Sequence, residues 1–254
     1  MHEQQVMIQM REMRLSTMAE SFKQRLDHND HKGISPQQFV ALLVEDEYVA
    51  RKNRRFQRMV GAANFKPEQA CLENLDYSPS RGLSKPDVMR LAGPAWIEEA
   101  KHVIITGPTG SGKTYLAEAI GLQACKMGYP AMKIRYRMLF EEIRAAKGTG
   151  TYLKYLKKIA RVRVLIIDDF LMQPVDQAEA AYLMDIIEEK QQLGSVAVTT
   201  QYPISKWHHQ LPDPTIADAI CDRLAHGAFT FNLKGESMRK KTAKNPVKMT
   251  DKKN

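Results

Sequence analysis

The eight residues from Gly107 to Thr114, GPTGSGKT, fit the pattern G-x-x-x-x-G-K-T/S and restrict the fold more than any other stretch. A β-branched apolar run, residues 102–106, precedes them, and an amphipathic stretch, residues 115–128, follows. Glycines let backbone amides converge on phosphate oxygens, and the start of a helix adds partial positive charge. The pattern therefore predicts a strand–loop–helix unit that binds a nucleotide phosphate, rather than a plain turn.

This loop predicts ATP and Mg²⁺ as cofactors. The Lys113 ammonium is expected at the β- and γ-phosphates, and the Thr114 hydroxyl is expected to ligate the metal. The predicted nucleotide-binding residues are Gly107, Pro108, Thr109, Gly110, Ser111, Gly112, Lys113, Thr114 and Tyr115.

A second acidic motif, VLIIDDF, covers Val164 to Phe170. Carboxylates at the carboxyl end of a strand lie beside the phosphate loop in open α/β sheets. We expect Asp168 to hold Mg²⁺ through water, and Asp169 to polarise the attacking water. A polar strand end at a turn is the ordinary alternative.

Phosphoryl transfer also needs groups that face the γ-phosphate, because negative charge is spread over its oxygens. The strand end SVAVTTQYP offers Thr199, Thr200 and Gln201 to position the water. Arg223 and Arg239 are candidate cations, although each alone could be an ordinary surface arginine. An arginine supplied by a neighbouring subunit would make hydrolysis depend on assembly.

Five short apolar runs alternate with helical stretches in the second half of the chain, which predicts a parallel sheet covered on both faces. The runs are residues 102–106, 131–135, 163–168, 195–200 and 228–233. We predict a helical N-terminal domain, a connecting segment, an ATPase core and a basic, disordered tail, at residues 1–65, 66–100, 101–239 and 240–254.

The N-terminal region reads as helical from Val6 to Leu26, where apolar residues recur at helical spacing. Ser35 and Pro36 predict the start of another helix. Its far end, Arg51 to Arg58, is basic and is either a solvated helix end or a phosphate-contacting face.

The whole chain carries a net charge of +9, which favours an anionic partner such as nucleic acid or simply a soluble basic protein. There is no signal peptide and no apolar run of membrane-spanning length, so we expect a cytoplasmic protein without a membrane partner. The three cysteines have no metal-ligand spacing.

Taken in order, GPTGSGKT, LIIDDF, TTQYP, DRLAHGA and GESMR resemble the IstB-like ATPases, the transposition helpers of bacterial insertion sequences. The resemblance covers roughly residues 10–240 and is close to the DnaC helicase loaders. It implies a five-stranded AAA+ core, a homo-oligomer assembled on duplex DNA, and recruitment or stimulation of a transposase. It implies that Arg223 is an arginine finger, Arg239 a second sensor, and Thr200 or Gln201 the first sensor.

Two departures from the wider AAA+ superfamily matter. The second acid of the motif is commonly Glu, whereas Asp169 is one methylene shorter, and we therefore expect slow hydrolysis. The chain also continues only briefly after the last predicted strand, so we expect no full C-terminal lid.

We expect DNA to contact the long stretch between the second strand and the acidic motif, where relatives resembling DnaA and DnaC carry an insertion. The candidates are Arg144, Lys147, Thr149, Tyr152, Lys154, Lys157 and Lys158; a solvated helix with Leu153 and Leu156 inward is the alternative. No base-reading motif is present, which predicts phosphate contacts with little sequence preference.

Two other functions fit parts of this pattern. A DnaC-like loader would use a similar core to remodel a replicative helicase. A small-molecule P-loop kinase would transfer the γ-phosphate to a metabolite, although the adjacent carboxylates Asp168 and Asp169 suit water activation better.

Overall fold

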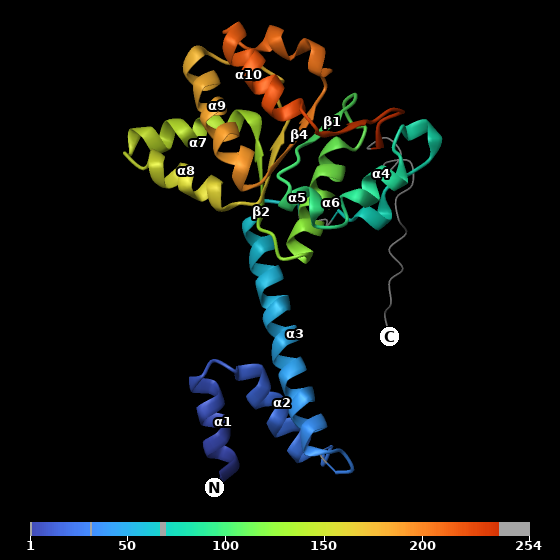
Figure 1. Ribbon diagram of the computed structural model, residues 1–254, viewed down its shortest axis with the longest axis vertical. Coiled ribbons are helices and arrows are strands. Elements are labelled where there is room, and N and C mark those ends of the chain that lie inside the picture. The colour runs from blue at the N-terminus through green and yellow to red at the C-terminus, as the bar shows by residue number, and fades with distance from the viewer. Residues whose placement is uncertain (1, 31, 67–69, 239–254) are drawn as a thin grey trace, which may run out of the picture. The chain divides into compact units, whose positions relative to one another are not determined.

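The computed structural model of the protein describes residues 2–30, 32–66 and 70–238 (Figure 1). The chain forms two compact units, Met1–Arg58 and Met59–Asn254. The predicted disordered tail, residues 240–254, lies outside the described residues.

The first unit is helical, with α1 (His2–Glu12), α2 (Ser16–Asp27) and the first part of α3 (Pro36–Ala62). The helical spacing between Val6 and Leu26 is divided between two helices, because Arg14 adopts a left-handed φ of 61°. The predicted start at Ser35 is confirmed: its hydroxyl accepts from Gln38 N–H, and Gln38 Oε1 accepts from Ser35 N–H.

The second unit contains a parallel five-stranded sheet in the order β2-β3-β4-β1-β5. The strands are β1 (Val103–Thr106), β2 (Ala131–Arg135), β3 (Val164–Asp168), β4 (Ser195–Thr200) and β5 (Phe229–Asn232). Each lies within a run predicted from the sequence, so the predicted α/β fold with a five-stranded parallel sheet is confirmed. Every residue of β3 and β4 is buried, as expected for central strands of a parallel sheet that is covered on both faces.

Helices cover the two faces of this sheet (Figure 1). Helix α6 (Lys113–Lys126) packs on one face. The other face builds the main apolar core, in which strand residues such as Ile104, Leu165 and Val198 meet four helices. Those helices are α7 (Tyr136–Gly148), α8 (Tyr152–Arg161), α9 (Gln177–Leu193) and α10 (Pro214–Ala225).

Short helices fill the remaining connections of the second unit. They are η1 (Leu72–Asn74), η2 (Pro79–Arg81), α4 (Lys85–Arg90), α5 (Ala95–Glu98) and η3 (Ile204–Gln210). Among the described residues, no helix is both long enough and apolar enough to cross a membrane.

Candidate nucleotide site

The phosphate loop joins the end of β1 to the start of α6, as predicted. Its three glycines adopt positive φ values of 148° at Gly107, 79° at Gly110 and 96° at Gly112. These angles lie in the region that side chains disfavour. A Cβ at Gly110 would also collide with the Ser237 side chain. Backbone conformation and close packing therefore both require glycine in this loop.

Two polar side chains inside the loop fit a phosphate. Lys113 is buried, and its Nζ donates to the carbonyls of Gly107 at 2.8 Å and Pro108 at 2.9 Å. The Ser111 hydroxyl is buried and has no hydrogen-bond partner among the described residues. A buried hydroxyl without a partner is costly, so an anion that accepts from it would relieve that cost.

The two predicted metal ligands contact each other at the carboxyl end of β3. The Thr114 hydroxyl donates to Asp168 Oδ1 at 2.9 Å and lies 3.2 Å from Oδ2. Asp168 is buried, and Thr199 donates a second hydrogen bond to its Oδ1 at 2.6 Å. A hydroxyl beside a buried carboxylate supplies the hard oxygen ligands that Mg²⁺ prefers.

Asp169 turns away from the sheet with a left-handed φ of 58°, and its side chain is exposed. Its backbone N–H donates to Thr199 Oγ1 at 3.1 Å, which holds this turn. Asp169 lines a cavity of about 480 Å³ together with Thr109, Arg135, Tyr136, Arg137, Met172, Gln173 and Gln201. The second acid therefore faces an open space beside the phosphate loop, where water can enter.

The residues at the end of β4 that were proposed to position the attacking water lie in different surroundings. Gln201 lines the Asp169 cavity, whereas the Thr200 hydroxyl is buried and accepts from Tyr202 N–H. Thr199 instead contacts both acids of the motif, although only its neighbours were singled out as sensors. Side chains at successive strand positions point to opposite faces, so Thr199 is separated from Thr200 once the register of β4 beside β3 is known.

Arg81 is a residue of this site that the sequence did not reveal. Its buried guanidinium donates to Ser111 O in the phosphate loop and, at 2.9 Å, to Glu236 O beyond β5. Met238 N–H donates to Gly110 O in the same loop at 2.9 Å. Hydrogen bonds thus connect the phosphate loop with Arg81 on one side and with the segment after β5 on the other.

A partly apolar cavity of about 300 Å³ borders the loop on this side. It is lined by Asn74, Leu75, Asp76, Arg81, Leu83, Ser111, Gly112, Tyr115, Leu116, Leu233 and Met238. An apolar pocket with a few polar groups at its edge suits a flat heteroaromatic ring.

Arg223 is held within its own chain. Its guanidinium donates to Ala219 O at 3.2 Å and to Glu188 Oε1 at 3.1 Å, and thereby joins α10 to α9. Neither partner belongs to the phosphate loop. Arg239 lies outside the described residues.

The predicted DNA-binding residues fall into two groups. Lys154, Lys157 and Lys158 are exposed on one side of α8, and exposed Arg161 extends the same side. Leu153 is 72% exposed, so this residue does not point inward as the solvated-helix alternative assumed. Leu156 packs against the core, as that alternative expected, and Tyr155 and Ile159 form the buried side of α8.

The other group is engaged with neighbouring side chains. Arg144 pairs with Glu179 at 2.6 Å, and Lys147 donates to Tyr182 Oη at 2.7 Å. The Tyr152 hydroxyl donates to Asp185 at 3.1 Å. Burial, and to a smaller extent this hydrogen bond, raises the pKa of Tyr152 to about 12. Thr149 caps the end of α7 through Ala145 O at 3.0 Å.

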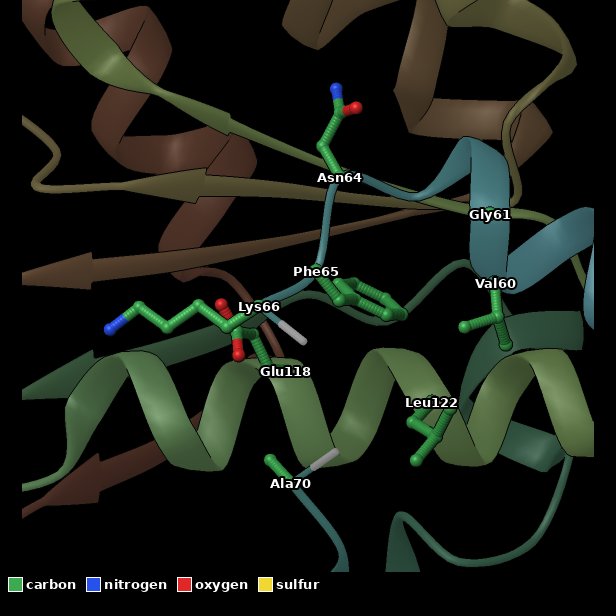
Figure 2. Close-up of a pocket in the computed structure, with 8 residues that line it drawn as sticks. All are labelled: Val60, Gly61, Asn64, Phe65, Lys66, Ala70, Glu118 and Leu122. Atoms are coloured by element: carbon green, nitrogen blue, oxygen red, sulfur yellow. The ribbon is translucent and has the colours of Figure 1, made fainter. Parts of the chain in front are cut away.

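A separate hollow of about 220 Å³ lies beside α6. Figure 2 shows its lining by Val60, Gly61, Asn64, Phe65, Lys66, Ala70, Glu118 and Leu122. Glu118 forms an ion pair with Lys133, so its carboxylate already has a partner.

Residues 8–246 match the family described as IstB-like ATP binding protein. The chain is 34% identical to the insertion sequence ATP-binding protein y4pL of Sinorhizobium fredii, over 90% of this chain and 93% of that protein. It is 30% identical to the insertion sequence IS21 ATP-binding protein of Pseudomonas aeruginosa, over 95% of this chain and 90% of that one.

Among solved structures, AMPPCP-bound DnaA from Aquifex aeolicus matches 74% of this chain and 58% of that chain, with a TM-score of 0.58 and 16% identity. The DnaC helicase loader matches 66% of this chain and 98% of that chain, with a TM-score of 0.55 and 18% identity. These similarities support the fold, while the sequence matches establish the family. The chain belongs to the family of IstB-like ATP binding proteins.

Proposed function

We propose that this protein is a Mg²⁺-dependent ATPase that assembles as a homo-oligomer on duplex DNA and recruits or stimulates a transposase. The contact of Thr114 and Thr199 with the buried Asp168 carboxylate, beside the Lys113 loop, is the observation that supports the Mg²⁺-dependent ATPase activity. Membership of a family whose relatives are insertion sequence proteins supports the link to transposition.

Each residue of the site has a role in this proposal. Lys113 exchanges its two carbonyl partners for the β- and γ-phosphates, and the cavity at Tyr115 takes the adenine ring. Thr114 and Asp168 would hold Mg²⁺, which supplies positive charge to the phosphates. Asp169 accepts a proton from the attacking water, and Gln201 orients that water.

In this proposal Arg223 acts toward a neighbouring subunit, which requires its guanidinium to leave Glu188 on α9. Its side chain is 25% exposed, so it can be presented to a second copy that approaches α10. An arginine acting in trans makes hydrolysis depend on assembly. ATP binding would then drive assembly on DNA, and hydrolysis would drive release.

The test is steady-state ATP hydrolysis with and without duplex DNA of random sequence. We expect slow hydrolysis by the protein alone, stimulation by duplex, and loss of activity in Lys113→Ala and Arg223→Ala. ATP turnover that ignores DNA and transfers the γ-phosphate to a metabolite in place of water would contradict the proposal in favour of a kinase. Pull-down with the transposase of the same insertion sequence, against a replicative helicase, separates a transposition helper from a helicase loader.

A further inference from the structure

The first unit carries a groove that the nucleotide site does not use. Its volume is about 840 Å³, and it is lined by Arg14, Arg51, Arg54, Arg55 and Arg58, with Asn53 and Gln57. Residues 51–58 contain five basic side chains and no acidic one. The groove is therefore strongly positive.

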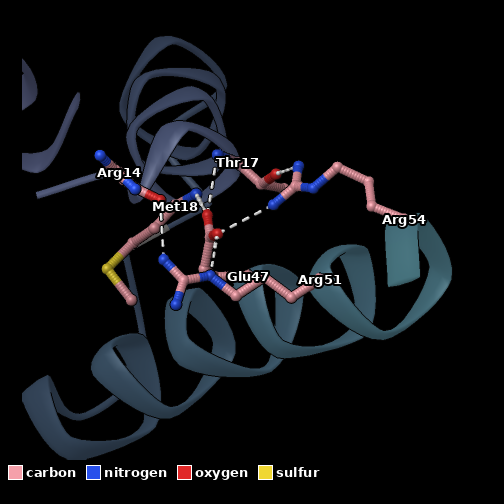
Figure 3. A network of polar contacts seen from close by, with 6 residues as sticks. All are labelled: Arg14, Thr17, Met18, Glu47, Arg51 and Arg54. Carbon is pink, nitrogen blue, oxygen red and sulfur yellow. Dashed lines mark hydrogen bonds and ion pairs between the residues drawn. The ribbon is translucent and has the colours of Figure 1, made fainter. Parts of the chain in front are cut away.

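Glu47 holds two arginines of this groove, Arg51 and Arg54 (Figure 3). Its buried carboxylate accepts from Arg51 Nε at 2.8 Å and from Arg54 Nη2 at 3.0 Å. It also accepts from the N–H groups of Thr17 and Met18, both at 2.9 Å, which caps the start of α2. Burial alone would raise the pKa of Glu47, but the hydrogen bonds from Arg51 and these amides lower it.

The fixed guanidinium groups keep donors for a ligand. Arg51 also donates to Arg14 O at 2.7 Å, and Arg54 donates to Thr17 Oγ1 at 2.9 Å. These side chains are still 51% and 53% exposed. A guanidinium has five N–H donors, so each arginine retains donors beyond the two contacts described. Their positions are set in advance, which lowers the entropy lost on binding.

The chemistry of the lining favours nucleic acid over a protein partner. Protein interfaces combine arginine with large aromatic anchors at their centre, whereas the described lining of this groove consists of arginines and carboxamides without an aromatic side chain. Arg, Asn and Gln are side chains that donate to backbone phosphates, and arginine matches a phosphate with two parallel hydrogen bonds.

The spacing also fits a nucleic-acid strand. Arg51 and Arg58 are seven residues apart on α3, which is about 10 Å along the helix. Phosphates of one strand follow each other by about 3.4 Å along a duplex axis. The arginines of α3 can therefore reach two or three phosphates.

We infer that the arginine groove of the first unit is a second nucleic-acid contact, which binds backbone phosphates separately from α8. This inference rests on the proposed DNA-binding function. The N-terminal helices would then contribute part of the affinity for duplex DNA without a preference for its sequence.

The test compares Arg55→Ala/Arg58→Ala with wild type in the full-length protein with ATP, by fluorescence anisotropy on a random-sequence duplex from 50 to 300 mM salt. This pair leaves the Glu47 contacts in place. We expect binding about tenfold weaker or more, and a salt slope reduced by about 2, because each lost phosphate contact lowers the slope by about 0.9. Lys23→Ala/Lys32→Ala removes the same charge from exposed positions outside the groove and should leave the slope unchanged.

A parallel Lys154→Ala/Lys157→Ala variant separates this inference from the proposed function. If that variant loses affinity while Arg55→Ala/Arg58→Ala keeps the wild-type slope, the groove inference is overturned and the function stands. If the arginine pair alters only capture of the transposase and not duplex affinity, the groove is a protein interface and the inference is also overturned. If wild type binds no duplex, both fail.

Discussion

Replacing Thr199 with valine should weaken both the fold and the chemistry of the nucleotide site. Valine has nearly the same shape, so no cavity forms, but two hydrogen bonds are lost. The bond to the Asp168 carboxylate, 2.6 Å long, is worth about 1.5–3 kcal/mol, and that from Asp169 N–H, 3.1 Å long, about 0.5–1.5 kcal/mol. We expect a total loss of about 2–4 kcal/mol, with Thr199→Ser as the matched control that keeps the hydroxyl.

Urea unfolding followed by tryptophan fluorescence measures this loss. Both tryptophans, Trp96 and Trp207, are buried in the second unit, so the signal reports that unit alone. With a slope of about 2 kcal/mol per M, the Thr199→Val midpoint should fall by about 1–2 M.

ATP hydrolysis measures the second consequence. Without its anchor at Thr199, the turn at Asp169 loosens, and we expect a loss of about tenfold or more in rate. An unchanged midpoint together with an unchanged rate in Thr199→Val would refute this account of Thr199.

Three further predictions concern other parts of the second unit. Glu118→Gln should destabilise it by about 3–5 kcal/mol by leaving the Lys133 charge buried without its partner, and Glu118→Leu/Lys133→Met should recover most of that loss in the same urea assay. Burial lowers the pKa of His102 from 6.5 to about 4, so the unfolded state binds more protons than the folded state between these two pH values. The free energy of unfolding should therefore fall by about 3 kcal/mol as the pH drops through this window. Urea midpoints measured at each pH test this, and the fall should be smaller in His102→Gln. Asp169→Asn should hydrolyse ATP far more slowly and accumulate on duplex DNA with ATP in filter binding; rapid release from DNA would count against hydrolysis as the release step.

The strands and the phosphate loop were predictable because their signals are local. Alternating apolar runs and the glycine-lysine pattern depend on neighbours in the chain. The break at residues 13–15 was not predictable, since the apolar spacing continues across it while Arg14 adopts a left-handed φ.

Contacts between distant segments account for what the sequence missed in the site. Arg81 belongs to a stretch that looked like a connector, yet its guanidinium is buried against Ser111 O and Glu236 O. Nothing local marks an arginine whose partners are backbone carbonyls 30 and 155 residues away. Thr199 could have been distinguished from Thr200 by strand alternation, but only once the register of β4 beside β3 is known.

Sedimentation of the purified protein with duplex DNA tests the central claim most directly, comparing ATP, ADP and no nucleotide. The account predicts large complexes only when both DNA and ATP are present, and none with Lys113→Ala or Arg223→Ala. A protein that remains monomeric with ATP and duplex, or that assembles equally well with ADP, would contradict it.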